Sequence, residues 1–174
     1  PESLMLRGDS YRALGRTDDA LADLRHAIRL APTVRDLRVA LVATLEEAGR
    51  ADEARAELAP ILDALQHSQR SDAALPERIA YEHAKLLVRE GTHEAEKLIE
   101  AVRVIDAALP ASRAGSISYL MLLYLRAKAL DRAGRFEEAW ESATRAHASR
   151  NVAFDPDALI RATDETIQWW TRER

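Results

Sequence analysis

An internal repeat constrains the fold of this chain more than any other feature. The segment ALGRTDDALADL at 13–24 returns as EAGRADEARAEL at 47–58 and as RAGRFEEAWESA at 132–143. The neighbours of Gly15 and Gly49 keep the spacing of the two glycines, whereas the intervals to Gly91 and then to Gly134 are longer. A period of about 34 residues, as in the first interval, is typical of solenoids, in which one small unit is stacked on the next.

Apolar residues at helical spacing stand before and after each of these glycines, so each unit reads as two helices. The pattern predicts one helix before Gly15, one between it and Pro32, and others at 35–48, 52–66, 77–90, 93–108, 117–133 and 136–149. Pro60 falls inside the fourth and should bend it. A last amphipathic stretch begins at Asp155 and Pro156, a typical helix start, and is expected to cap the stack.

The spacing of small and apolar residues resembles the signature of the tetratricopeptide repeat (TPR) family. The first unit has Leu4, Gly8, Tyr11, Gly15, Ala20, Leu24, Ala27 and Pro32, and the fourth has Leu123, Ala127, Leu130, Gly134, Ala139, Ala143 and Ala146. The resemblance implies an all-α fold, a right-handed α-solenoid forming one domain over 1–174. Its units would be about 1–34, 35–68, 77–110 and 120–151, followed by a C-terminal capping helix at about 156–172. The first helix of every pair would line a concave groove.

Pairs of carboxylates follow three of the glycines and could belong to a metal loop or to an acid/base pair. Each pair also falls in the first turn of a predicted second helix, where the helix dipole favours negative charge by about 0.3–1 kcal/mol. Calcium loops need further ligands at fixed offsets, and these are missing from the sequence. We therefore expect a structural role and no metal site for Asp18, Asp19, Asp52, Glu53, Glu137 and Glu138.

The remaining composition argues against chemistry within the chain. There is no cysteine, the five histidines have no helical pairing, and no nucleophile motif or phosphate-binding loop is present. We expect no catalytic site and no cofactor. The net charge of −4 lacks the concentrated basic surface of nucleic-acid binding, and no apolar run approaches the roughly 18 residues of a membrane span. A cytoplasmic location is expected, as is a longer parent protein, because Pro1 already stands in a helical pattern.

The groove positions implied by the TPR resemblance divide by charge along the chain. The groove positions of the first two units are Glu2, Met5, Asp9, Asp36, Val39, Glu46 and Glu47. The last two units supply the predicted binding residues, which are Arg78, Tyr81, Lys85, Arg89, Tyr124, Lys128 and Arg132. Met121 is a further groove position of the last unit. The basic half could hold an acidic protein or peptide segment through charge-assisted hydrogen bonds. A solvated helix face with scattered charge is the alternative. The only asparagine, Asn151, lies beyond the last predicted helix of the repeats, so the asparagine clamp of many family members is not expected.

Two functions remain open. The first is a helical-repeat scaffold that mediates protein–protein or peptide binding through its concave groove. The second follows from the tail AHASRNVAFDPDALIRATDETIQWW at 146–170, which resembles the segment that joins repeats to catalytic domains in bacterial TPR-containing sulfotransferases. The chain would then be a non-catalytic, substrate-recruiting or oligomerising part of such an enzyme. Trp140 should pack on the capping helix, and one of the adjacent Trp169 and Trp170 should face another domain or a second copy.

Overall fold

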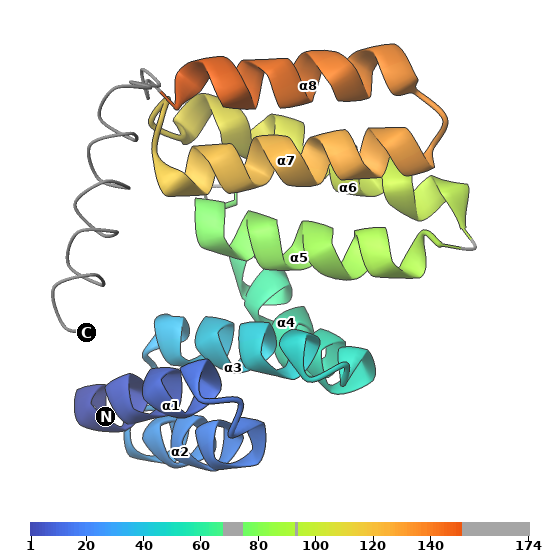
Figure 1. Cartoon of the computed structure of the whole chain (residues 1–174). Coiled ribbons are helices and arrows are strands. Elements are labelled where there is room, and N and C mark those ends of the chain that lie inside the picture. Colours follow the sequence, from blue (N-terminus) through green and yellow to red (C-terminus); the bar gives the residue numbers. More distant parts are fainter. Residues whose placement is uncertain (68–74, 93, 151–174) are drawn as a thin grey trace, which may run out of the picture.

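Antiparallel helix pairs, stacked one on another, form the whole of the structure described here. The computed structural model describes residues 1–67, 75–92 and 94–150. Within these ranges the helices are α1 (Glu2–Ala13), α2 (Thr17–Leu30), α3 (Arg35–Glu47), α4 (Ala51–Gln66), α5 (Glu77–Glu90), α6 (Ala95–Ala108), the short η1 (Leu109–Ala111), α7 (Ile117–Arg132) and α8 (Phe136–Ser149) (Figure 1). The predicted all-α class is confirmed. The predicted capping helix, with Trp169 and Trp170, lies outside the described residues, and the single-domain division stays a prediction.

The three repeated joints have the same backbone geometry. Each first helix ends at a glycine with positive φ, namely Gly15 (71°), Gly49 (76°) and Gly134 (75°). The following arginine amide donates to the carbonyl five residues earlier: Arg16 to Tyr11 at 2.8 Å, Arg50 to Leu45 at 2.9 Å and Arg135 to Leu130 at 2.9 Å. Glycine adopts this left-handed conformation without steric cost, which explains its recurrence at these sites.

The carboxylate pairs are held by the arginines of the same joints. These arginines precede the second helix and pair with its second acidic residue: Arg16 with Asp19 at 2.8 Å, Arg50 with Glu53 at 2.6 Å and Arg135 with Glu138 at 2.6 Å. Helix dipole and ion pair therefore act together. No group of acidic or histidine residues in the described ranges is arranged to hold a metal ion.

Gly91 departs from this pattern, although its sequence setting is similar. It follows α5 with φ −62°, which any residue can adopt. A β-carbon at this position would lie only 2.5 Å from Cδ2 of Leu98 on α6. Glycine is therefore required at position 91 because α5 and α6 approach each other closely. Its backbone is not left-handed, unlike that of the glycines at the other three joints.

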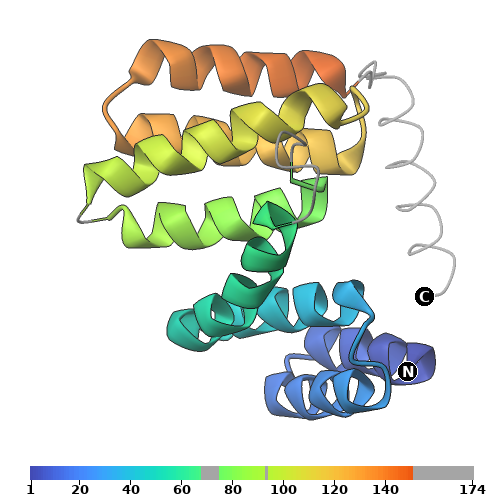
Figure 2. The same cartoon turned by 180° about the vertical axis from the view of Figure 1, so that it is seen from behind.

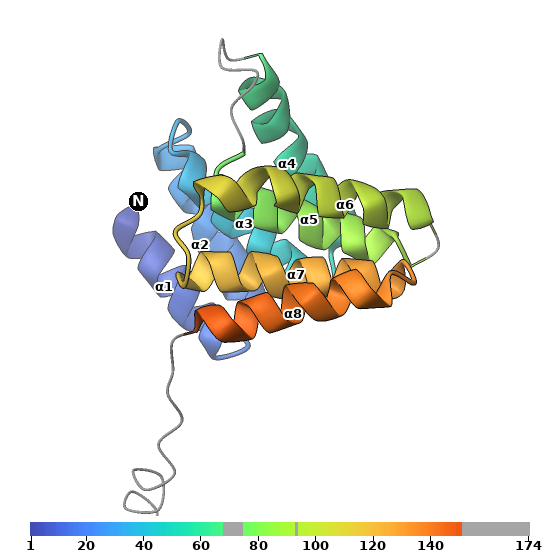
Figure 3. The ribbon, with the colours of Figure 1, turned by 90° about the horizontal axis from the view of Figure 1, so that it is seen from above.

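The buried residues form two clusters rather than one continuous core. One cluster belongs to α2, α3 and α4 and includes Ile79 and Leu86 of α5. The other belongs to α5, α6, α7 and α8. Between them, α4 packs much less on α5 than α2 packs on α3 or α6 on α7. Figure 2 shows α4 crossing from the lower to the upper pairs, and in Figure 3 its end projects beyond the other helices. Helix α4 continues through Pro60.

The last pair leaves large apolar side chains in solvent. On α8, Trp140 is 75% exposed and Phe136 is 66% exposed. The predicted packing of Trp140 on the capping helix involves residues outside the described ranges. Within the described part of the chain Trp140 stands at the open edge of the stack.

Candidate functional site

A pocket of about 490 Å³ lies on the face formed by the first helices of the second, third and fourth pairs. Its lining comes from the end of α3, from α5 and the turn after it, and from α7: Glu46, Tyr81, Lys85, Val88, Arg89, Thr92, Met121, Tyr124, Leu125, Lys128 and Arg132. Six of the seven predicted binding residues are thus brought together. The exception is Arg78, which is exposed near the start of α5 and does not line the pocket.

Apolar and aromatic side chains lie between the charged ones. Val88 and Leu125 are buried beneath the pocket, whereas Met121 and Tyr124 are 40% and 44% exposed. The ammonium of Lys85 lies 5.5 Å from the ring centroid of Tyr81. Burial raises the pKa of Tyr81 although Lys85 acts in the opposite direction, so the ring keeps its hydroxyl proton at neutral pH. The pocket therefore combines cations with surface that an apolar ligand group could cover.

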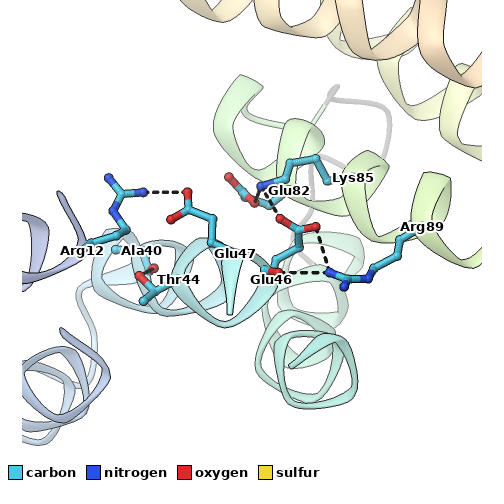
Figure 4. A network of polar contacts seen from close by, with 8 residues as sticks. All are labelled: Arg12, Ala40, Thr44, Glu46, Glu47, Glu82, Lys85 and Arg89. Carbon is cyan, nitrogen blue, oxygen red and sulfur yellow. Dashed lines mark hydrogen bonds and ion pairs between the residues drawn. The ribbon is translucent and has the colours of Figure 1, made fainter. Parts of the chain in front are cut away.

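Glu46 is the charged residue of this pocket whose role the sequence did not predict. It belongs to α3, and the sequence places it in an acidic half of the groove. Instead its carboxylate lies 2.7 Å from Nζ of Lys85 and 3.3 Å from a terminal guanidinium nitrogen of Arg89 (Figure 4). That guanidinium also donates to the main-chain carbonyl of Glu46 at 3.1 Å. No local pattern indicates this contact, because it depends on how the second pair meets the third.

Lys85 keeps its charge despite being mostly buried. Desolvation by itself would lower the pKa of its ammonium, but the hydrogen bond to Glu46 and the charges of Glu82 and Glu46 outweigh it, so the net pKa is raised. Glu82 lies 3.4 Å from the ammonium and is only 5% exposed. Burial raises the pKa of Glu82 above its ordinary value, because Lys85 only partly offsets the loss of water around the carboxylate.

Glu82→Gln is expected to stabilise the protein at neutral pH. A carboxyl whose folded pKa is raised binds more protons in the folded state, so its contribution to stability falls as pH rises from its unfolded value through its folded pKa. Glutamine removes that loss. The variant should therefore gain stability over the native protein as pH rises, and match it in acid below the ordinary glutamate pKa.

Urea unfolding at acidic and neutral pH measures this difference. The matched control is Glu47→Gln, because Glu47 is 46% exposed and pairs with Arg12 instead. A Glu82→Gln protein less stable than the native one at neutral pH would contradict the prediction.

The two pocket cations on α7, Lys128 and Arg132, are in a different situation from the pocket cations on α5. Within the described residues Lys128 makes no ion pair, and Arg132 bonds only the main-chain carbonyl of Val88, at 3.0 Å. The pocket lining holds four basic residues and one acidic residue, Glu46. Its excess positive charge therefore lies at the α7 side.

The other predicted groove positions do not form an equivalent acidic site. The prediction that Val39 faces the groove is wrong: it is 1% exposed in the first core cluster, since α3 is covered by neighbours on more than one side. Asp9 and Glu47 both pair with Arg12, at 3.4 and 3.0 Å. Glu2 and Asp36 are exposed and stand apart from the pocket.

Comparison with known proteins agrees with this architecture. Residues 11–75 match the tetratricopeptide repeat family. The solved structure named "MamA MSR-1 C2" has a TM-score of 0.57 with this chain at 18% identity, covering 84% of this chain and 74% of the other. No curated protein is significantly similar to the chain.

Neither the family match nor this structural match is to a sulfotransferase, so they lend no support to that resemblance. Across the described residues, no helix combines the length and apolar character needed to span a membrane. The chain has a TPR-like helical-repeat fold, in which the first helices of successive pairs share one face.

Proposed function

We propose that this chain is a protein-interaction scaffold that binds an acidic segment of a partner protein in the pocket on α3, α5 and α7. The observation that carries the proposal is the pair of pocket cations on α7, Lys128 and Arg132. Lys128 and Arg132 lack a carboxylate partner among the described residues and lie beside the half-exposed Met121 and Tyr124. Most other cations on α3, α5 and α7 already have acidic partners.

The energetic argument requires several contacts together. A single exposed ion pair contributes about 0.2–1 kcal/mol, which is too little for specific binding. Carboxylates of a bound segment would pair with Lys128 and Arg132 through charge-assisted hydrogen bonds. An apolar side chain of the segment would cover Met121 and Tyr124, which supplies hydrophobic burial as well. An extended peptide that combines acidic residues with interspersed apolar ones has this chemistry.

The direct test uses a fluorescein-labelled peptide of sequence EELEELEE and its glutamine counterpart QQLQQLQQ. We expect the native protein to bind only the acidic peptide, more weakly as salt is added. The double variant Lys128→Glu, Arg132→Glu should weaken binding by about tenfold or more, because each reversal replaces an attraction with a repulsion. Fluorescence anisotropy measures both affinities.

A matched control carries the same change in net charge elsewhere. Arg29 on α2 and Arg103 on α6 are exposed and lie outside the pocket. The double variant Arg29→Glu, Arg103→Glu should therefore bind the acidic peptide with nearly native affinity at moderate salt. Equal losses in the two double variants would show a general charge effect, and unchanged binding after reversal at 128 and 132 would exclude the pocket.

The sulfotransferase alternative receives no support from the described residues. The tail that suggested it begins at 146 and lies almost entirely outside them. The proposed role is binding, without chemistry of its own. Oligomer formation through the C-terminal helix and a cytoplasmic location remain predictions.

A further inference from the structure

The four cations of the pocket differ in whether a carboxylate of the protein pairs with them. Those on α7 have no carboxylate partner among the described residues, whereas Lys85 and Arg89 on α5 share one carboxylate, that of Glu46. One oxygen of Glu46 faces the ammonium at 2.7 Å and the other faces the guanidinium at 3.3 Å. Glu46 comes from α3, so it reaches the site from the preceding pair of helices.

The carboxylate of Glu46 offers the same chemical group as an acidic ligand would. Its side chain is 16% exposed and lines the pocket, so the ion pair can be reached from the open side. A ligand carboxylate that approaches Lys85 and Arg89 must therefore compete with Glu46 for the same donors. If the carboxylates of Glu46 and of the ligand both stayed beside these two cations, their negative charges would repel each other.

Neighbouring groups allow this exchange without leaving a buried charge unpaired. Glu82 lies 3.4 Å from the ammonium of Lys85 and would keep that charge compensated while Glu46 leaves. Arg89 would retain its bond to the main-chain carbonyl of Glu46, which does not depend on the carboxylate. The cations are thus held in place by groups other than the one that would be displaced.

We propose that Glu46 is an internal competitor of the ligand. In the free protein its carboxylate occupies Lys85 and Arg89, and a second acidic group of the bound segment displaces it. This inference rests on the proposed function and names the residue that limits affinity at the same site. It requires a segment with at least two acidic groups, one for the cations of α7 and one for those of α5.

Glu46→Gln tests the inference, because the amide keeps the size of the side chain and removes its charge. We expect this variant to bind EELEELEE about fivefold more tightly than the native protein, the size of a modest charge-pair effect on binding. Glu47→Gln is the matched control. Its side chain points away from α5 to pair with Arg12, so its affinity should stay within about twofold of native, apart from the small effect of net charge.

The outcomes separate this inference from the proposed function. Native protein that binds the acidic peptide, with Glu46→Gln binding equally or more weakly, would overturn the internal competitor and leave the scaffold role standing. Failure of both proteins to bind would overturn the proposed function and this inference with it. A Glu46→Gln protein that binds where the native protein binds weakly supports both.

A second measurement does not depend on how the variant folds. In native protein labelled with ¹³C at glutamate carboxyls, addition of EELEELEE should shift the Glu46 signal as its partners change. The Glu47 signal should remain, since its contact with Arg12 lies outside the pocket. A Glu46 signal that stays constant at saturating peptide would overturn the proposal.

Discussion

Leu45→Ala is expected to destabilise the first half of the molecule by about 2–5 kcal/mol, the range for emptying a buried leucine site. Leu45 is fully buried in the cluster built from α2, α3 and α4. The cluster of α5 to α8 is made of other residues. Loss of packing around Leu45 should reach α5, which contributes Ile79 and Leu86 to the same cluster. It should reach α7 and α8 only weakly, because α3 and α4 contact the second half mainly through α5 and those contacts are small.

Amide hydrogen exchange measures this asymmetry helix by helix. In Leu45→Ala, protection should fall in α2, α3 and α4 while α7 and α8 remain close to native. Leu130→Ala is the matched variant, because Leu130 is fully buried in the second cluster and should give the reverse pattern. Equal loss of protection in both halves for either variant would show that the two clusters unfold as one unit.

Gly91→Ala should cost about 1–3 kcal/mol, the range for overpacking a filled core. The new β-carbon would lie 2.5 and 2.6 Å from Cδ2 and Cγ of Leu98, and 3.2 Å from the carbonyl of Leu87. Leu98 is 2% exposed, so it has little room to move. Relief would have to come from separating α5 and α6, which would loosen the second core.

A comparison with Gly15 separates crowding from backbone strain. A β-carbon at Gly15 would meet nothing within 4 Å, but φ there is 71°. Alanine at Gly15 is expected to cost about 1–2 kcal/mol from the left-handed backbone, and asparagine should cost less because it tolerates that conformation. At Gly91, asparagine should be at least as damaging as alanine. Thermal unfolding of the four variants measures the contrast, and a benign Gly91→Asn would contradict the close approach.

The helices and their joints were predictable because their causes lie close together in the sequence. A helix period, a glycine after the first helix and an arginine three residues before an acid act within one turn of backbone. The observed helix bounds accordingly lie within two residues of those expected for 35–48 through 136–149. The different role of Gly91 could not be foreseen, since its φ and its contact with Leu98 depend on how closely α5 and α6 pack.

Residues of the groove were predictable only where the spacing within one helix determines which face they lie on. Lys85 and Arg89 share a face of α5, as do Tyr124 and Lys128 on α7, and helical spacing places such residues together. Val39 is buried because α3 lies between neighbours, which its own sequence does not reveal.

The sequence by itself determined the helical-repeat class, the paired helices and the repeated joints, because these depend on interactions between residues a few positions apart. Only the tertiary structure decided that the core is divided in two and that Glu46 meets Lys85 and Arg89. Those features depend on how the second pair of helices is placed against the third, and the interval from Gly49 to Gly91 there is longer than that from Gly15 to Gly49. Local periodicity carries no information about that placement.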